Sequence, residues 1–235
     1  MPVEYGAFGV KVAVDVLKRP ATKGIAWAYT TITGRQVLIL GPARAGKSSF
    51  RDFLRYGVLE TEQPTQKTVE TQQTTAFRVS IGRDESLVLK VRSAIDVPGQ
   101  VGPMEHAKIA EKRRPHAIVV MLDLSAPWAG DSERATAKWL IEFCNHLEER
   151  LRSNKTMLKR LKGLIFVANK SDTQTQEALE KRISDIRRII AKNLDGVYAT
   201  KVEAMPIMPC ILIQHEAAQP LAEAVIIRLA KMLSE

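Results

Sequence analysis

The chain has 235 residues, of which 45% are hydrophobic and 26% are charged, and its formal net charge at pH 7 is +9. These values are ordinary for a folded protein with one sizeable domain and an extension. The longest apolar runs, at 117–122 and 164–168, are too short to cross a bilayer, and the first residues do not form a secretory signal. Cys144 and Cys210 lie far apart, which fits a reducing compartment. We therefore expect a cytoplasmic protein, with peripheral attachment to a membrane as an alternative.

Six short apolar segments have the length and the Val, Ile and Leu content of β-strands. They are residues 36–40, 76–81, 87–95, 117–122, 164–168 and 207–213. A short turn joins the second to the third and predicts a hairpin, whereas segments with helical spacing separate most of the others. These helical segments are 48–56, 132–152, 174–191 and a last one opened by Pro220. Strands separated by helices run parallel, so we predict a three-layer α/β fold with a six-stranded, mostly parallel sheet, one antiparallel strand and helices on both faces.

The first residues stand outside this pattern. We predict an amino-terminal extension at 1–34 and a main domain at 35–235. The valines of residues 10–16 alternate as in a strand, although Val12 and Val16 are also spaced as in a helix, and the sequence leaves both readings open. The extension is either an arm packed on the domain or a docking segment for a partner or a membrane surface.

Residues 41–48, Gly-Pro-Ala-Arg-Ala-Gly-Lys-Ser, match the pattern GxxxxGK[ST] of a phosphate-binding loop between a strand and a helix. Glycines let the backbone turn tightly so that successive N–H groups face phosphate oxygens, and the following helix adds its positive end. Lys47 can reach the outer phosphates, and the Ser48 hydroxyl can ligate Mg²⁺. The predicted phosphate-binding residues are Gly41, Arg44, Ala45, Gly46, Lys47, Ser48 and Ser49.

A second motif, Asp96-Val-Pro-Gly99-Gln100, follows the third strand. The Asp96 carboxylate can hold magnesium directly or through water. The Gly99 N–H can contact the terminal phosphate of a nucleotide, and Gln100 can orient the attacking water. Lys47, Gly99 and Gln100 are therefore the predicted catalytic residues.

A threonine in the loop before the second strand is expected to complete the metal site. Several threonines lie there, and Thr75 is preferred because it stands directly before the strand, with Thr74 as the alternative. The predicted metal ligands are then Ser48, Thr75 and Asp96.

A third motif, Asn169-Lys170-Ser171-Asp172, follows the fifth strand. The Asp172 carboxylate can accept hydrogen bonds from the ring N–H and the exocyclic amine of guanine, whereas adenine presents an acceptor and no amine there. Asn169 can donate to the other edge of guanine and tie the loops together, and the Lys170 stem can lie along the nucleotide. The motif therefore predicts guanine binding.

With these three motifs in this order, the chain resembles the Ras-like small GTPases of the translation-factor-related P-loop class, over roughly residues 35–235. The Asp96–Gln100 run is similar to Ras-type and Arf-type members, and the Thr74-Thr75 pair resembles Era-like members. The resemblance implies a Mg²⁺-dependent switch that alternates between GTP and GDP, hydrolyses GTP slowly by itself and signals through loops near Thr75 and Gly99. It also implies a protein effector, with activating (GAP) and exchange (GEF) proteins as further partners.

Two segments depart from the family pattern. Ala43 and Arg44 stand where Ras-type members carry glycines, and Gln214-His215-Glu216-Ala217 stands where the family has a Ser-Ala pair. Two other functions stay open at this stage. The chain is alternatively a docking subunit that holds nucleotide without hydrolysis, or a ribosome- or RNA-associated GTPase, which the positive charge favours.

Basic residues gather on the predicted helices. Arg152, Lys155, Lys159 and Lys162 share a face if the helix continues through Ser153 and Asn154; Arg182, Arg187, Arg188 and Lys192 lie on the next helix, and Lys112, Arg113 and Arg114 follow the second motif. These residues can contact an anionic membrane or RNA, and a solvated helix face is the alternative. The aromatic content of 6%, without aromatics interleaved among the charges, disfavours a platform for single-stranded nucleic acid.

Overall fold

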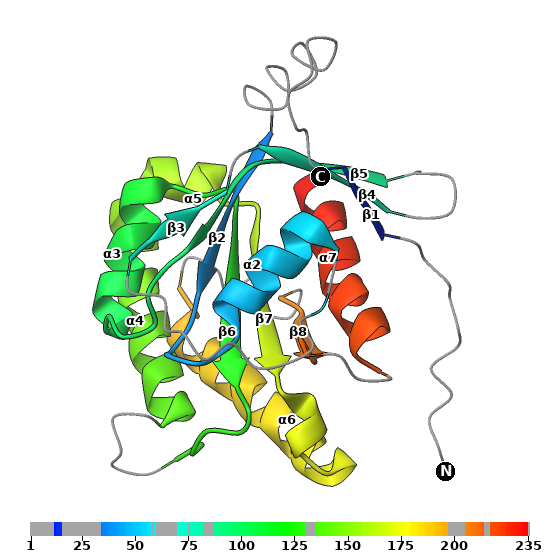
Figure 1. Ribbon diagram of the computed structural model, residues 1–235. Coiled ribbons are helices and arrows are strands. Elements are labelled where there is room, and N and C mark those ends of the chain that lie inside the picture. Colours follow the sequence, from blue (N-terminus) through cyan, green and yellow to red (C-terminus); the bar gives the residue numbers. More distant parts are fainter. Residues whose placement is uncertain are drawn as a thin grey trace.

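The computed structural model describes residues 12–15, 34–57, 59, 70–74, 76–81, 87–129, 135–196, 205–213 and 217–234. These residues form one sheet of eight strands, in the order β1-β4-β5-β2-β6-β7-β8, with β3 pairing to β5 (Figure 1). The strands are β1 (Val12–Asp15), β2 (Arg35–Leu40), β3 (Gln72–Gln73), β4 (Phe77–Ile81), β5 (Leu87–Asp96), β6 (Ala117–Asp123), β7 (Gly163–Asn169) and β8 (Ile207–Cys210).

The predicted fold class is confirmed. Strands β5, β2, β6, β7 and β8 are parallel, and β4 pairs antiparallel with β5, which gives the expected six strands with one antiparallel member. The short β3 also pairs with β5, at its carboxyl end. At the outer edge, β1 pairs antiparallel with β4, so four residues of the amino-terminal extension form a strand. This pairing favours the strand reading at Val12 over the helical one.

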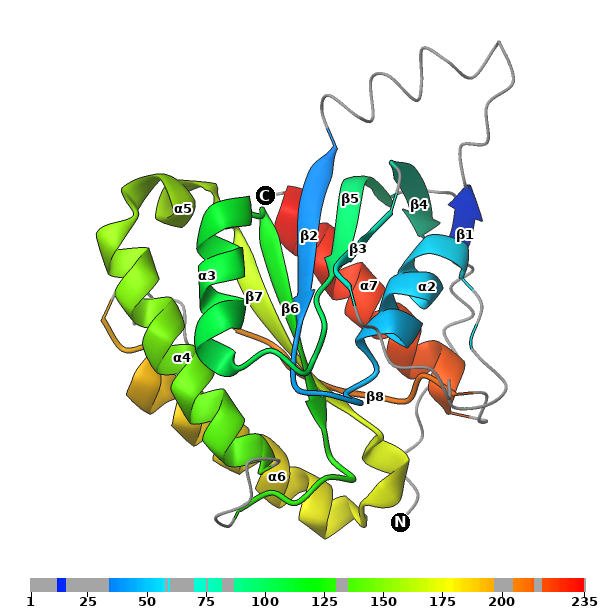
Figure 2. The ribbon, with the colours of Figure 1, turned by 60° about the vertical axis from the view of Figure 1, so that its left-hand side comes forward.

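Helices cover both faces of the sheet (Figure 2). They are α2 (Lys47–Tyr56), α3 (Pro103–Arg113), α4 (Thr136–Ser153), α5 (Lys155–Arg160), α6 (Gln176–Asn193) and α7 (Ala218–Ser234). Residues of α3, α4 and α6, such as Phe143 and Ile186, pack on one face, and residues of α2 and α7, such as Phe53 and Leu229, pack on the other. All seven residues of β6 are buried, because a central parallel strand is covered on both faces.

Two helical features differ from the prediction. Helix α3 was not predicted, because its buried side chains His106, Ala107 and Ala110 are small or polar and give no apolar stripe. The condition for a shared basic face is not met, because α4 ends at Ser153. Asn154 is the N-cap of α5, and its side chain accepts a hydrogen bond from Met157 N. Arg152 and Lys155 therefore lie on different helices, Lys162 lies beyond α5, and the predicted shared basic face does not form.

The carboxyl ends of the parallel strands lie along one edge of the sheet, where ligands bind in open α/β folds. Leu40, Asp96, Asp123 and Asn169 end β2, β5, β6 and β7 there. Among the helices in the described part of the chain, none is long and apolar enough to cross a lipid bilayer.

Candidate functional site

The phosphate-binding loop joins β2 to α2 and depends on two glycines. Gly41 and Gly46 have φ angles of 145° and 86°, which side chains rarely adopt. A Cβ on Gly41 would lie 2.2 Å from the Met121 carbonyl oxygen, and one on Gly46 would lie 2.3 Å from Asn169 Nδ2. Gly46 is also the N-cap residue of α2 and has no side chain to cap the helix. The N–H groups of the first helical turn can therefore donate to a bound anion.

The other loop positions differ in exposure. Ala45 and Ser49 are buried, whereas Ala43 and Arg44 are exposed. Arg44 has a φ of 63°, so a bulky side chain occupies a left-handed position that favours glycine. The Arg44 side chain is thus on the outer surface of the loop, and its backbone carries the strain.

Lys47 supplies the positive charge of the loop. Its side chain is buried, and its Nζ donates a hydrogen bond of 2.8 Å to Pro42 O, across the loop. Burial lowers the pKa of Lys47 to about 8, and the negative charge of Asp96 opposes this fall. The ammonium group is therefore still mainly protonated at pH 7 and lies close to a carboxylate.

Asp96 is fully buried and connects the second motif to the phosphate-binding loop. The Ser48 hydroxyl donates a hydrogen bond of 2.6 Å to Asp96 Oδ2, while Asp96 Oδ1 is buried and has no hydrogen-bond partner among the described residues. Burial raises the pKa of Asp96, and the hydrogen bond from Ser48 and the charges of Lys47 and Arg51 act against this rise. Magnesium is bound by oxygen atoms, and this site offers two: the unpartnered carboxylate oxygen of Asp96 and the neighbouring hydroxyl oxygen of Ser48.

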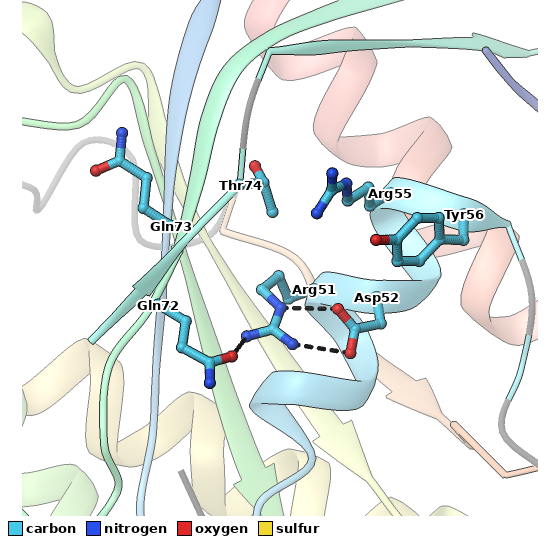
Figure 3. Close-up of a pocket in the computed structure, with 7 residues that line it drawn as sticks. All are labelled: Arg51, Asp52, Arg55, Tyr56, Gln72, Gln73 and Thr74. Carbon is cyan, nitrogen blue, oxygen red and sulfur yellow. Dashed lines mark hydrogen bonds and ion pairs between the residues drawn. The ribbon is translucent and has the colours of Figure 1, made fainter. Parts of the chain in front are cut away.

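Arg51 is a site residue that the motifs did not reveal. Its Nη1 lies 3.5 Å from Asp96 Oδ2, and its guanidinium makes two contacts of 2.8 Å with the Asp52 carboxylate and a hydrogen bond with Gln72 (Figure 3). The pocket in this figure lies between α2 and β3. Arg51 stands three residues after Ser48, a helical spacing that places both on one face and could have indicated its position.

The structure does not bring Thr74 to the predicted metal site. Its buried hydroxyl accepts a hydrogen bond of 2.9 Å from Ala94 N, and its own N–H donates to Ala94 O. Gln72, not Thr74, is the register partner of Asp96. The preferred candidate, Thr75, lies outside the described residues, as does most of the loop before β3.

The loop after β5 lies against the phosphate-binding loop. A Cβ on Gly99 would lie 2.5 Å from Lys47 Nζ and 2.5 Å from Ala43 N, so only glycine fits between the two loops. Gln100 follows in the same turn and is exposed. The second motif thus brings Gly99 next to Lys47 and leaves the Gln100 side chain open to solvent.

His106 supports this loop from inside the protein and was not predicted. Its Nε2 lies 3.2 Å from Pro98 O, and its ring meets Trp139 edge-on, with ring centroids 5.4 Å apart. Burial, together with the charge of Lys47, lowers the pKa of His106 to about 4. The imidazole is therefore neutral at pH 7, with the Nε2 hydrogen donated to Pro98 O.

Asn169 links the third motif to the phosphate-binding loop. Its Nδ2 donates a hydrogen bond of 3.0 Å to Ala45 O, and its Oδ1 is buried without a partner among the described residues. Asp172 lies in a single 3₁₀ turn (Ser171–Thr173) and is exposed. The Ser171 hydroxyl donates to Cys210 O and holds this turn to β8.

A salt bridge that the motifs did not reveal holds Lys170. Its Nζ lies 2.7 Å from Asp123 Oδ2 at the end of β6, and Asp123 Oδ1 accepts hydrogen bonds from the N–H and the hydroxyl of Ser125. Lys170 itself has a φ of 61°. The sequence signal for this salt bridge was Asp123, an acidic residue at the end of an apolar strand.

The loop in which the GTPase family has a Ser-Ala pair is mostly outside the described part of the chain, because residues 214–216 are not described.

No protein-family model matches the sequence, and no curated protein matches it. Several solved structures are similar. A chain of the signal recognition particle receptor SRb-GTP/SRX complex from Chaetomium thermophilum is 15% identical, with a TM-score of 0.56, over 83% of this chain and 99% of that chain. A dimerization-deficient mutant of Toc33 from Arabidopsis thaliana is 12% identical, with a TM-score of 0.59, over 92% and 94%.

Translation elongation factor SelB from Methanococcus maripaludis, in complex with the GTP analogue GPPNHP, is also similar, at 15% identity and a TM-score of 0.47 over 83% of this chain. The match covers 34% of SelB, so this chain spans about a third of that factor. At identities of 15% and 12%, the likeness to the SRb-complex chain and to Toc33 shows a shared fold.

Proposed function

We propose that this chain, which has the fold of the small P-loop GTPases, binds GTP and GDP and hydrolyses GTP to GDP and phosphate as a molecular switch. The observation that carries the proposal is the hydrogen bond from Asn169 Nδ2 to Ala45 O, because it joins the predicted guanine-binding and phosphate-binding loops into one site. The Ser48–Asp96 hydrogen bond adds the second motif to the same site. Three segments far apart in sequence therefore converge at one edge of the sheet.

Each part of the site has a role in this function. The backbone of residues 41–48 and the Lys47 ammonium bind the phosphates, and Asp172 selects guanine by accepting from its N–H and its amine. Gln100, exposed beside Gly99, orients the attacking water. Because Gln100 only positions water, we expect slow intrinsic hydrolysis that an activating protein accelerates.

Ser48 and Asp96 are the residues that would hold magnesium, and Thr75 is the proposed third ligand. The buried, unpartnered Asp96 Oδ1 supports this assignment, since a carboxylate oxygen in that setting needs a cation or a donor. A magnesium ion held by these residues would neutralise negative charge on the nucleotide phosphates. The remaining oxygen ligands would come from the nucleotide and from water.

The Gly99 loop lies directly against Lys47. A group bound by Lys47 would therefore lie beside this loop. We propose that GTP orders this loop and the loop near Thr75, and that a protein effector distinguishes the GTP form from the GDP form. A cytoplasmic location, with a membrane surface as the alternative, belongs to the same proposal.

The experiment is equilibrium binding of labelled GTP and ATP with Mg²⁺, followed by single-turnover hydrolysis. We expect GTP to bind at least a hundredfold more tightly than ATP, by about 3 kcal/mol, and to be hydrolysed at roughly 10⁻⁴ to 10⁻² s⁻¹. Gln100→Leu should slow hydrolysis about tenfold or more without changing GTP affinity, and Lys47→Ala serves as the variant without phosphate binding. Equal affinity for ATP would refute the guanine assignment. Hydrolysis at the wild-type rate in Gln100→Leu would refute the role of Gln100.

A further inference from the structure

A cluster of basic side chains lies at the amino ends of the central strands, on the edge of the sheet opposite the phosphate-binding loop. This basic end cluster consists of Arg35, Arg92, Arg114, His116, Arg160 and Lys162. Its members come from four separate chain segments, which lead into or lie in β2, β5, β6 and β7. Arg114 and Lys162 are also among the basic residues noted from the sequence, but no motif joins the four segments, because the fold alone brings them together.

Two backbone hydrogen bonds and one to the His116 side chain fix segments of the cluster side by side. His116 N donates to Gln36 O at 2.9 Å, Gln36 N donates to His116 Nδ1 at 2.9 Å, and Lys162 N donates to His116 O at 2.7 Å. The three strands continue in register from this point, with Val37 beside Ala117 and Ala117 beside Gly163. The starts of β2, β6 and β7 are therefore adjacent.

A change of register in β5 places Arg92 at the same edge. Arg35 pairs with Val91, and the next residue of β2, Gln36, pairs with Ser93. Arg92 is thus the extra residue of a β-bulge and has no partner on β2. Bulges redirect a side chain out of the regular alternation of a strand, and they often do so beside functional sites.

The positive charges of this cluster are only partly offset by acidic side chains in the described part of the chain. Across the described ranges, no carboxylate forms an ion pair with Arg35, Arg92, Arg114, Arg160 or Lys162. Glu111, on the neighbouring helix α3, binds Arg150 and Asn154, and its charge also acts on Arg114 of the cluster. The sequence between β1 and β2, residues 16–34, carries three basic residues and no Asp or Glu.

Two members of the cluster show the effect of their neighbours. Burial and the charges of Arg92 and Arg114 lower the pKa of Arg160, whose Nε is buried without a hydrogen-bond partner in the described structure. Burial and the surrounding cations lower the pKa of His116 to about 4. The imidazole is therefore neutral, and because its Nδ1 accepts from Gln36, its Nε2 carries the hydrogen and can donate to an anion.

Helix ends explain the position of only some of these basic residues. Arg114 caps the carboxyl end of α3 and Arg160 is the last residue of α5, where carbonyl groups favour cations. Arg35, Arg92 and Lys162 lie in or beside strands and gain nothing from a helix dipole. In the described structure the Glu111 carboxylate acts on Arg114. Holding the five cations together with so little counter-charge costs free energy that a bound anion would return.

We propose that the basic end cluster binds a compact, multiply charged phosphate group. Four of its five cations are guanidinium groups, whose planar donors match phosphate oxygens in pairs. Four neighbouring strands span about 14 Å at ~4.8 Å per strand, which suits a polyphosphate or a phosphorylated head group rather than a long polymer. The site is separate from the proposed nucleotide site and does not depend on GTP hydrolysis.

The test is calorimetric titration of the full chain with sodium tripolyphosphate and with inositol hexakisphosphate, in the presence of saturating GDP and Mg²⁺. We expect saturable binding of one ligand per chain, and the double variant Arg160→Gln/Lys162→Gln should weaken it at least tenfold. Both side chains lie outside the core strands, and the melting temperature of the variant checks its folding. A second variant, Arg92→Gln, should weaken binding in the same way.

Two controls separate this site from other sources of binding. Arg182→Gln/Arg188→Gln removes two positive charges from α6 and should leave the affinity unchanged. Lys47→Ala, which alters the phosphate-binding loop, should also leave the affinity for the compact phosphate unchanged. Weaker binding in this variant would show that the phosphate binds at the proposed nucleotide site. Liposomes containing a phosphorylated inositol lipid, compared with phosphatidylserine liposomes of equal charge, distinguish a lipid head group from a soluble phosphate, and either result supports the site. Absence of saturable binding, undiminished binding in both cluster variants, or binding of RNA but of neither compact phosphate would overturn the proposal.

Discussion

Arg51 Nη1 lies 3.5 Å from Asp96 Oδ2, so a side-chain cation contacts the carboxylate that is predicted to serve magnesium. A divalent ion at Asp96 is repelled by this guanidinium. Arg51→Ala should therefore lower the Mg²⁺ concentration needed to retain nucleotide by about three- to tenfold, or ~1 kcal/mol. The measurement is the release rate of labelled GDP as a function of free Mg²⁺.

Arg55→Ala is the matched control for this prediction. Arg55 lines the same pocket one helical turn further on, and the pKa of Asp96 responds to the charge of Arg51 and not to that of Arg55. Its removal should leave the Mg²⁺ dependence unchanged. An unchanged midpoint in Arg51→Ala, or an equal shift in both variants, would contradict a specific effect of Arg51 on Asp96.

Asp172→Asn should change the base preference of the site. The amide loses one of the two acceptors offered to guanine, so GTP affinity should fall about a hundredfold or more. Its NH₂ group can instead donate to the second carbonyl of xanthine, and XTP should become the better ligand. Competition of both nucleotides against labelled GDP measures the change. Asp195→Asn, at an exposed acid near Arg152, should behave as wild type; a variant Asp172→Asn that still prefers GTP would rule out contact between Asp172 and the base.

His106 should make the stability fall in mild acid. Its pKa of about 4 in the folded chain lies below the ordinary value of 6.5, so the unfolded chain takes up a proton that the folded chain excludes. Its contribution is therefore complete above pH 6.5 and is lost as the pH falls from 6.5 towards 4, by about 3 kcal/mol in all. Urea unfolding at pH 7, 6 and 5 measures this slope.

His106→Phe keeps a ring against Trp139 and removes the titrating group. The pH dependence of its free energy of unfolding should be shallower than that of the wild type between pH 6.5 and 4. His116, whose pKa is also about 4, titrates in the same window and remains in both proteins, so the difference between the two curves isolates His106. Two parallel curves would show that His106 does not cause the slope.

Arg44→Gly should stabilise the fold. Arg44 has a φ of 63°, and a side chain in this region costs about 1 kcal/mol that glycine does not. The gain is reduced by the greater freedom of glycine in the unfolded chain, so we expect a net increase of up to ~1 kcal/mol in the free energy of unfolding. Ala43→Gly is the control: Ala43 is exposed in the same loop and is not among the described residues with positive φ, so it should lose a few tenths of a kcal/mol to ~1 kcal/mol. Destabilisation by both changes would contradict this account.

The sequence predicted the sheet well because its parallel strands are short runs that must be apolar on both faces. Residues 117–122 and 164–168 fall inside β6 and β7, and both strands are completely buried. Helix α3 escaped prediction because its packing relies on His106 and two alanines, which carry no periodic hydrophobic signal. The break at Asn154 was accessible in principle, since asparagine is a preferred N-cap residue, but an amphipathic pattern runs through it.

The contacts around the candidate site were less accessible from sequence. Motif spacing placed Lys47, Asp96 and Asn169 on three loops at one edge, because strand order decides which loops meet. Arg51 beside Asp96 and Lys170 beside Asp123 depend on side-chain reach between elements 45 and 47 residues apart, which no local pattern encodes. The choice between Thr74 and Thr75 also depended on register: pairing of Gln72 with Asp96 directs the Thr74 hydroxyl to Ala94. The roles of these site residues stay predictions.

The bond between Asn169 and Ala45 also sets an order of events during synthesis, because its two residues are 124 positions apart in the chain. Ribosomes add about 5–20 residues per second, so about 6–25 s separate the two loops in a growing chain. During this interval the phosphate-binding loop exists without the strand that carries Asn169. On the proposed function, a nascent chain can select guanine only after β7 has joined β6, and cellular GTP therefore stabilises the finished domain rather than the partial one.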